Sequence, residues 1–240
     1  MSSWCDGEFL GFDTETTGVD VTSDRIVSAA LVLRRGATSR VRTWLVDPGV
    51  EIPPAASAIN GITTDLVRAS GSPPAVALEE IASALVRAQR DGVPLVAYNA
   101  AFDLVLLDNE LVRHGLPRLA ERLRPCLPVI DPLLLDRALD GLRDAPRTLG
   151  DLCMHYGVAT RADLHTAEVD VLATLDVLTG IAAAFPQIGE MSLPDLHSWQ
   201  VTKYREWAEG HNARRAAEQR PGRDVDPGWP MPVEELASAS

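Results

Sequence analysis

The sequence has few cysteines, and none belongs to a paired motif. The 240 residues include only Cys5, Cys126 and Cys153, an odd number at wide spacing. Without a C-x-x-C pair, neither a disulfide framework nor a zinc ribbon is predicted. This cysteine usage suits a reducing compartment, and we expect a cytoplasmic protein.

Long apolar runs and a targeting segment are also missing. The first eight residues, MSSWCDGE, have neither a basic stretch nor an apolar one, so we expect no signal peptide. No apolar run approaches the roughly 20 residues of a membrane-spanning helix. We therefore expect no membrane partner.

Positive charge is scarce, because the formal net charge is −12. This balance argues against a protein that grips a long duplex through its phosphates. It does not exclude an enzyme that handles a few nucleotides through bound cations, because the metals then supply the positive charge.

What the chain does contain is a succession of strand and helix patterns. Apolar or alternating runs predict strands at residues 9–12, 26–33, 41–46, 94–98 and 127–131. Helical periodicity predicts helices at residues 76–88, 104–112, 148–156, 166–184 and 195–219. Strands first, then alternating strands and helices, indicate an α/β fold with a mixed sheet.

The composition changes after Pro186, which suggests three parts: a tail over 1–7, a domain over 8–186, and a C-terminal helix and flexible tail over 187–240. The C-terminal helix carries Trp199, Tyr204 and Trp207 in a stretch with a surplus of Lys and Arg. It could contact an extended strand, or pack on the domain through its tryptophans. Residues 221–240 are rich in Pro, Gly, Asp and Ser and are predicted to be flexible.

Two carboxylates follow the first predicted strand, at Asp13 and Glu15. Positions i and i+2 on an extended chain point to the same side. Paired carboxylates at a buried strand end repel each other and lose hydration, at a cost of several kcal/mol per ion. The nearest basic residue is Arg25, so a hard divalent cation such as Mg²⁺ would resolve the problem. The alternative is a turn, for which DTETTG is also suitable.

Asp103 follows the segment NAAF near the start of the 104–112 helix. It could join the two acids, or it could be a helix N-terminal acid favoured by the macrodipole. Asp170 and His165 lie about 140° apart on an ideal helix, so they would not share a face. We expect His165 on the preceding loop and Asp170 one turn into the helix, partly buried beside Val171. The alternative for His165 is a surface or capping histidine.

Together, three segments resemble a known family. FDTETTG, YNAAFD and HTAEVD match the three motifs of the DEDDh group of DnaQ-like (RNase T-like) exonucleases, over roughly residues 8–185. The resemblance implies an RNase H-like fold, with a mixed central β-sheet flanked by helices and the C-terminal helical extension outside it. Residues 55–63 look like the segment before the first helix in that family. Tyr98 and Asn60 stand where many relatives have His, which bears on substrate preference.

The resemblance also implies a chemistry. Members remove 5′-mononucleotides from 3′ ends with two divalent cations, Mg²⁺ or Mn²⁺. By analogy Asp13 would bridge both ions, Glu15 and Asp170 would complete one, and Asp103 would reach the other through water. His165 would take the proton from the attacking water.

Candidate substrate contacts also come from the resemblance. The turn formed by Thr16, Thr17 and Gly18 would approach the terminal sugar and base. Phe102 could stack on a base or belong to the core. Asn99 could fix the loop or touch the sugar.

Four functions remain open from the sequence. The first is a DNA 3′-5′ exonuclease, in repair or as the proofreading partner of a DNA polymerase, acting on single-stranded 3′ ends. The second trims RNA or short oligonucleotides. The third is a non-catalytic nucleic-acid or polymerase-binding module, against which the intact acids weigh. The fourth, a Ca²⁺-binding protein, needs more oxygen ligands than DTETTGVD offers.

Overall fold

A computed structural model describes residues 4–122, 128–159 and 166–232. Its centre is a five-stranded sheet in the order β3-β2-β1-β4-β5. The strands are β1 Glu8–Thr16, β2 Ile26–Arg35, β3 Thr38–Leu45, β4 Leu95–Val96 and β5 Val129–Ile130. The first three form an antiparallel meander, and β4 and β5 run parallel to β1. The predicted mixed sheet is confirmed.

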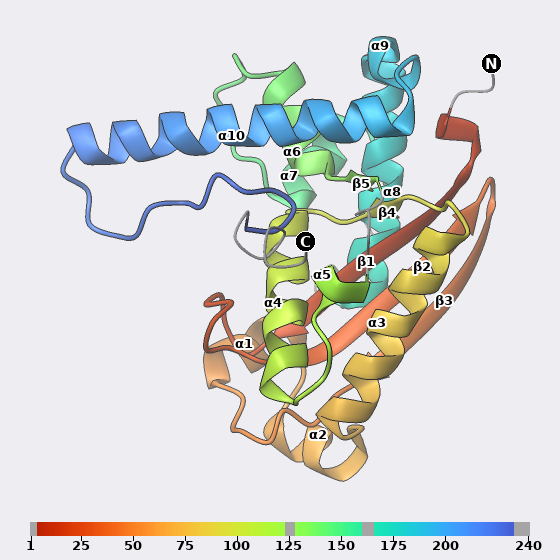
Figure 1. The fold of residues 1–240 in the computed structure, drawn as a ribbon, viewed down its shortest axis with the longest axis vertical. Coiled ribbons are helices and arrows are strands. Elements are labelled where there is room, and N and C mark those ends of the chain that lie inside the picture. Colours follow the sequence, from red (N-terminus) through yellow and green to blue (C-terminus); the bar gives the residue numbers. More distant parts are fainter. Residues whose placement is uncertain (1–3, 123–127, 160–165, 233–240) are drawn as a thin grey trace.

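Helices cover both faces of this sheet (Figure 1). They are α1 Pro54–Asn60, α2 Thr64–Ser70, α3 Pro74–Arg90, α4 Ala100–Arg113, α5 Leu119–Arg122, α6 Pro132–Leu139, α7 Leu149–His155, α8 Ala167–Ala184, α9 Pro186–Gly189 and α10 Leu193–Ala217. Leu10 and Phe12 of β1 pack with α3 and α4, whereas Phe9 packs with α8. The alternation of side chains along β1 therefore separates two hydrophobic cores.

Strand β1 is longer than its apolar run predicts. It pairs with β2 as far as Thr16, so Asp13 and Glu15 lie inside the strand and not after it. Residues 55–63, expected to precede the first helix, instead include most of α1, and α2 begins directly after them. Pro54 begins α1, and the hydroxyl of Thr63 accepts the Leu66 N–H at the start of α2. Such capping signals are separate from apolar periodicity, which is why the periodicity missed these short helices.

The C-terminal helix α10 completes the edge of the sheet beside β5. The Val129 N–H donates to His197 Nδ1 at 3.2 Å, and Gln200 Nε2 donates to the Val129 carbonyl at 3.0 Å. Gln200 Oε1 accepts the Asp131 N–H at 2.8 Å. Side chains of α10 thus replace the missing strand partner, since buried backbone groups must be hydrogen-bonded.

The tail after α10 is packed in part. Trp229 and Met231 are each 3% exposed and join the core on the α3–α4 side, although composition predicted a flexible tail over 221–240. Asn212 on α10 hydrogen-bonds both backbone groups of Val225 and directs the chain back. Within the described parts of the chain, no helix has the length and apolar character needed to cross a bilayer.

Candidate active site

The two acids of β1 lie beyond the end of its parallel neighbour. Strand β4 pairs with β1 only at Leu10 and Gly11. The parallel neighbour β4 therefore ends before Asp13 and Glu15, and no strand of the described residues lies beside these two on that side of β1. The chain after β4 enters α4 there, which brings the first turn of α4 toward the two acids.

Helix α8 approaches the same part of β1 from the other face. A Cβ built on Gly11 would lie 2.3 Å from Val171 Cγ1 and 3.2 Å from Leu175 Cδ1, so only glycine allows this contact. Asp170 precedes Val171 and is carried to the strand with it. Carboxylate oxygens of Asp13, Glu15 and Asp170 all lie within 4.8 Å of one another.

Asp103 joins this group from α4. It is 3% exposed, and Thr14 Oγ1 donates to Asp103 Oδ1 at 2.6 Å. Thr14 points to the α4 face because it alternates with Asp13 and Glu15 along β1. The structure thus brings together the four acids predicted from sequence, from three elements, and we name them the carboxylate cluster. His165, the expected general base, lies outside the described residues.

A fifth acid, Asp131, organises the start of α4. Its carboxylate accepts the N–H groups of Asn99 and Ala100, each at 3.0 Å, and caps α6 through the Leu133 N–H at 3.0 Å. Asn99 has φ 59°, a left-handed conformation that reverses the chain between β4 and α4. Sequence reasoning missed Asp131, although an Asp before Pro132 is a helix-start signal.

Burial and mutual repulsion disfavour negative charge in the cluster. Burial, then Asp103, Asp170 and Glu15, raise the pKa of Asp13 well above its usual range. Burial, then Asp170 and Asp103, raise the pKa of Glu15 to about 8. Burial also raises the pKa of Asp103, against the hydrogen bond from Thr14.

The donor set fits a divalent metal. Among the described residues, no Lys or Arg forms an ion pair with Asp13, Glu15 or Asp103. Clustered, desolvated carboxylates without a cation are costly. Their oxygens are the ligands that Mg²⁺ and similar hard cations prefer.

The predicted substrate residues fall into two groups. At the end of β1, Thr17 Oγ1 donates to Asp24 Oδ1 at 2.8 Å and Thr16 Oγ1 donates to the Gly18 carbonyl at 2.6 Å, so both hydroxyls hold the turn. A Cβ on Gly18 would lie 2.5 Å from Asp24 Oδ2. At the start of α4, Asn99 is exposed and Phe102 is half-buried against the core.

The two positions that depart from the family pattern are structural contacts. Asn60 is buried, and its Nδ2 donates to the Thr16 carbonyl at 3.4 Å, which ties α1 to the end of β1. Tyr98 Oη donates to the Arg147 carbonyl at 2.6 Å. Both lie next to the segments that supply the cluster, Asn60 beside the end of β1 and Tyr98 just before α4.

A second group of possible ligands is already neutralised. Asp136 lies near Asp140 and His155, but it pairs with Arg143 and, at 2.8 Å, with Arg147 Nε. It also accepts a hydrogen bond from a tyrosine hydroxyl at 2.7 Å. These guanidinium groups satisfy the buried charge, so the group does not need a metal.

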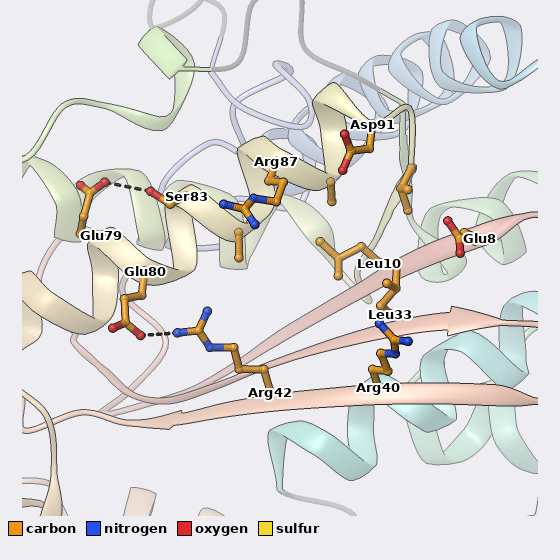
Figure 2. A pocket seen from close by; sticks show the side chains of 13 residues that line it. Glu8, Leu10, Leu33, Arg40, Arg42, Glu79, Glu80, Ser83, Arg87 and Asp91 are labelled. Atoms are coloured by element: carbon orange, nitrogen blue, oxygen red, sulfur yellow. Dashed lines mark hydrogen bonds and ion pairs between the residues drawn. The ribbon is translucent and has the colours of Figure 1, made fainter.

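A hollow of about 730 Å³ lies between α3 and the strands (Figure 2). Figure 2 shows Arg42 directed at Glu80 and Glu79 directed at Ser83 across its rim. Four of its charged lining residues form ion pairs, namely Glu8, Arg42, Glu79 and Glu80, and none of the four clustered acids lines it. It therefore contributes nothing to the chemistry of the cluster.

Comparisons with known proteins place these features in a family. The family model described as Exonuclease (RNase_T) matches residues 10–178. The chain is 33% identical over 178 residues to the DNA polymerase III subunit epsilon of Treponema pallidum, covering 73% of this chain and 76% of that protein. It is 32% identical over 168 residues to the PolC-type DNA polymerase III of Lacticaseibacillus paracasei, covering 70% of this chain but only 11% of that protein.

Solved structures show the same fold. Escherichia coli exonuclease I, in a zinc-bound complex with single-stranded DNA, superposes with a TM-score of 0.66 at 22% identity, covering 82% of this chain and 43% of that one. Exonuclease I from Methylocaldum szegediense has a TM-score of 0.64 at 22% identity, covering 84% and 46%. The chain therefore spans less than half of these structures. The likeness confirms the expected RNase H-like fold class.

Proposed function

Because the chain belongs to the RNase T family of exonucleases, we propose that it is a 3′-5′ exonuclease that removes 5′-mononucleotides from single-stranded DNA ends. The observation that carries this proposal is the carboxylate cluster, in which β1, α4 and α8 bring four acids together. The cluster is desolvated, and three of its members have no basic ion-pair partner among the described residues. Such a cluster suits the hydrolysis of phosphodiesters with divalent metal ions.

Each acid has a proposed place in that chemistry. Asp13, Glu15, Asp103 and Asp170 would together hold the divalent cations, and the charge of the other three acids acts on Asp13. Bound Mg²⁺ or Mn²⁺ would lower the pKa of an attacking water and stabilise charge on the departing 3′-oxygen. Thr14 holds the Asp103 carboxylate in place through its hydrogen bond.

We propose His165 as the general base, on the ground of its place in the HTAEVD motif directly before α8. An imidazole can accept a proton near neutral pH. His165→Ala is then expected to lose most activity and to keep metal binding. An equal loss of metal affinity would show that His165 is a ligand instead.

The terminal nucleotide would rest at the start of α4. Phe102 is half-buried, which leaves part of its ring available to a base, and stacking tolerates any sequence. Asn99 is exposed at the same turn and could donate to the sugar. Because the hydroxyls of Thr16 and Thr17 hold the turn, we propose that the turn up to Gly18 offers backbone groups.

The choice of DNA follows the matched relative, which is a DNA polymerase III subunit. A DNA polymerase is accordingly the proposed protein partner, in proofreading or repair. The exonuclease I structure bound to single-stranded DNA agrees with a single-stranded substrate. The chain covers only part of the length of several of these relatives.

The test compares 5′-labelled single-stranded DNA, RNA of the same sequence and a dinucleotide, each with Mg²⁺, with Mn²⁺ and with EDTA. We expect a metal-dependent ladder of shortened DNA. Asp103→Asn should reduce the rate by more than about 10²-fold, while the exposed Asp144→Asn should not. Faster cleavage of RNA would reassign the substrate. Absence of cleavage with both metals would overturn the enzymatic function.

A further inference from the structure

A second cavity lies between α6 and α10, as Figure 1 shows these helices crossing at one end of the molecule. Its volume is about 460 Å³, in the range of ligand-binding pockets. Residues from both helices and from the loop before α7 line it. We call it the α6–α10 pocket; its polar and aromatic lining consists of Arg137, Arg147, Lys203, Glu206, Trp207 and Arg214.

The pocket is basic in an acidic protein. Four cations and one carboxylate line it, whereas the whole chain carries −12. Arg147 is committed to the buried Asp136, and Lys203 pairs with Glu206 at 2.8 Å. No carboxylate of the described residues forms an ion pair with Arg137 or Arg214. Asp131 favours the charge of Arg137 from a distance without forming an ion pair with it. Two guanidinium groups that are not engaged in an ion pair within the described residues therefore share one cavity.

The environment of Arg137 preserves its capacity to bind an anion. Its guanidinium carbon lies 4.1 Å from the centroid of the Trp207 ring, which holds the group flat by cation–π attraction. Burial lowers the pKa of Arg137, although the side chain stays protonated at neutral pH. A desolvated guanidinium with free N–H donors is a strong partner for phosphate oxygens.

The start of α6 is tied to the start of α4, and the pocket is lined by residues further along α6. Asp131 caps α6 and also holds the first N–H groups of α4, the helix that carries Asp103. Arg137 comes five residues after Pro132, or roughly 8 Å along the axis of α6. A strand whose 3′ end lies at the cluster can therefore reach the pocket within a few nucleotides.

We propose that the α6–α10 pocket binds the phosphodiester backbone of the single-stranded substrate on the 5′ side of its terminal nucleotide. This rests on the proposed exonuclease function. Arg137 and Arg214 supply the phosphate contacts, and Trp207 positions Arg137. The two tryptophans of α10 have different roles: Trp199 packs on the domain core, and Trp207 lines the pocket.

The test measures fluorescence anisotropy of two labelled oligothymidylates, a strand of about 16 nucleotides and a dinucleotide too short to extend from the cluster to the pocket, in EDTA so that no hydrolysis occurs. We expect Arg214→Glu and Arg137→Gln to weaken binding of the longer strand by roughly tenfold. The dependence on salt should also fall by about 0.7 in slope per lost phosphate contact. Binding of the short strand should change little.

Arg205→Glu is the matched control, because Arg205 is an exposed arginine on α10 that does not line the pocket. Equal effects of the three variants on the longer strand would overturn the proposal. So would full competition by inorganic phosphate at concentrations near the oligonucleotide Kd, which would assign the pocket to a small free anion. If Arg137→Gln fails to fold, Arg214→Glu decides, because Arg214 is exposed.

Hydrolysis of thymidine 5′-p-nitrophenyl phosphate separates this proposal from the proposed function. This small diester reaches the cluster and cannot span to the pocket, so both pocket variants should hydrolyse it at the wild-type rate. Loss of that activity in the pocket variants would overturn a role confined to strand binding. If the wild-type protein hydrolyses neither this diester nor single-stranded DNA, the exonuclease proposal is wrong. The anisotropy measurement would still show whether the pocket binds the strand.

Discussion

The contact between Gly11 and α8 allows a sharp test of how the cluster is built. In Gly11→Ala the new Cβ would lie 2.3 Å from Val171 Cγ1, whereas carbon atoms in contact prefer about 3.5–4.0 Å. The helix or the strand must therefore move by roughly 1 Å or more. Rotation of Val171 offers little relief, because a valine in a helix strongly prefers one rotamer.

Two magnitudes follow from that displacement. Overpacking of this kind lowers the free energy of unfolding by about 1–3 kcal/mol. Asp170 is adjacent to Val171 and moves with it, and a displacement of about 1 Å at a catalytic group can reduce the rate by roughly 10²-fold. Both effects are expected in the same variant.

Denaturant unfolding and exonuclease rates with Mg²⁺ measure these effects. Gly210→Ala is the control for the same chemical change, because its Cβ would meet only Arg214 Nη1 at 3.6 Å. It is expected to stabilise the interior of α10 by up to about 1 kcal/mol. Val171→Ala alone leaves a cavity and costs roughly 2 kcal/mol, but in the Gly11→Ala background it should restore part of the lost stability and rate.

A Gly11→Ala variant that unfolds within about 0.5 kcal/mol of wild type and retains its rate would contradict this prediction. That result would mean that α8 does not approach β1 so closely. It would also remove the reason for Asp170 to lie beside Asp13.

Three further predictions concern single residues. Thr14→Val removes the hydroxyl that donates to Asp103 and should cost about 1–3 kcal/mol of unfolding free energy, with a further rise in the pKa of Asp103 visible in the pH–rate profile. The folded pKa of Glu15 is raised from 4.5 to about 8, so the stability that its protonation contributes is present below about pH 4.5 and is lost as the pH rises toward 8. In EDTA, the Tm of Glu15→Gln should therefore exceed the Tm of wild type by an amount that grows over this pH range. Bound Mg²⁺ should reduce that difference in Tm. Asn99→Gly should be nearly neutral at φ 59°, whereas Asn99→Ala should cost about 1–2 kcal/mol in denaturant unfolding.

The α10 interface shows what local patterns miss. Helical periodicity predicted a helix at 195–219, within two residues of Leu193–Ala217. The hydrogen bonds from α10 to the backbone of β5 could not be predicted from the sequence. His197 and Gln200 look like ordinary polar residues there, and only the fold brings them beside β5. The tail is similar: Gly, Pro and Asp predicted flexibility, but Trp229 finds a site on the core that is far away in sequence.

Asp131 and the first helices show a second limit. The capping signals at Pro54, Thr63 and Asp131 were present in the sequence, yet apolar periodicity does not detect them. The arrangement of Arg137 on Trp207 had no signal at all, because the two residues belong to helices separated by most of the C-terminal half.

The sequence by itself determined the order of the five strands and of the helices α3, α4, α7, α8 and α10. It also determined the alternation that sends Asp13 and Glu15 to one side of a strand, and the three motifs of the family. These features depend on residues only a few positions apart. The tertiary structure alone decided that Thr14 donates to Asp103, 89 positions away, and that Gly11 admits α8. It also decided that α6 and α10 enclose a basic pocket. Such contacts depend on how separate elements pack, and the energy of that packing is not carried by any local stretch of the chain.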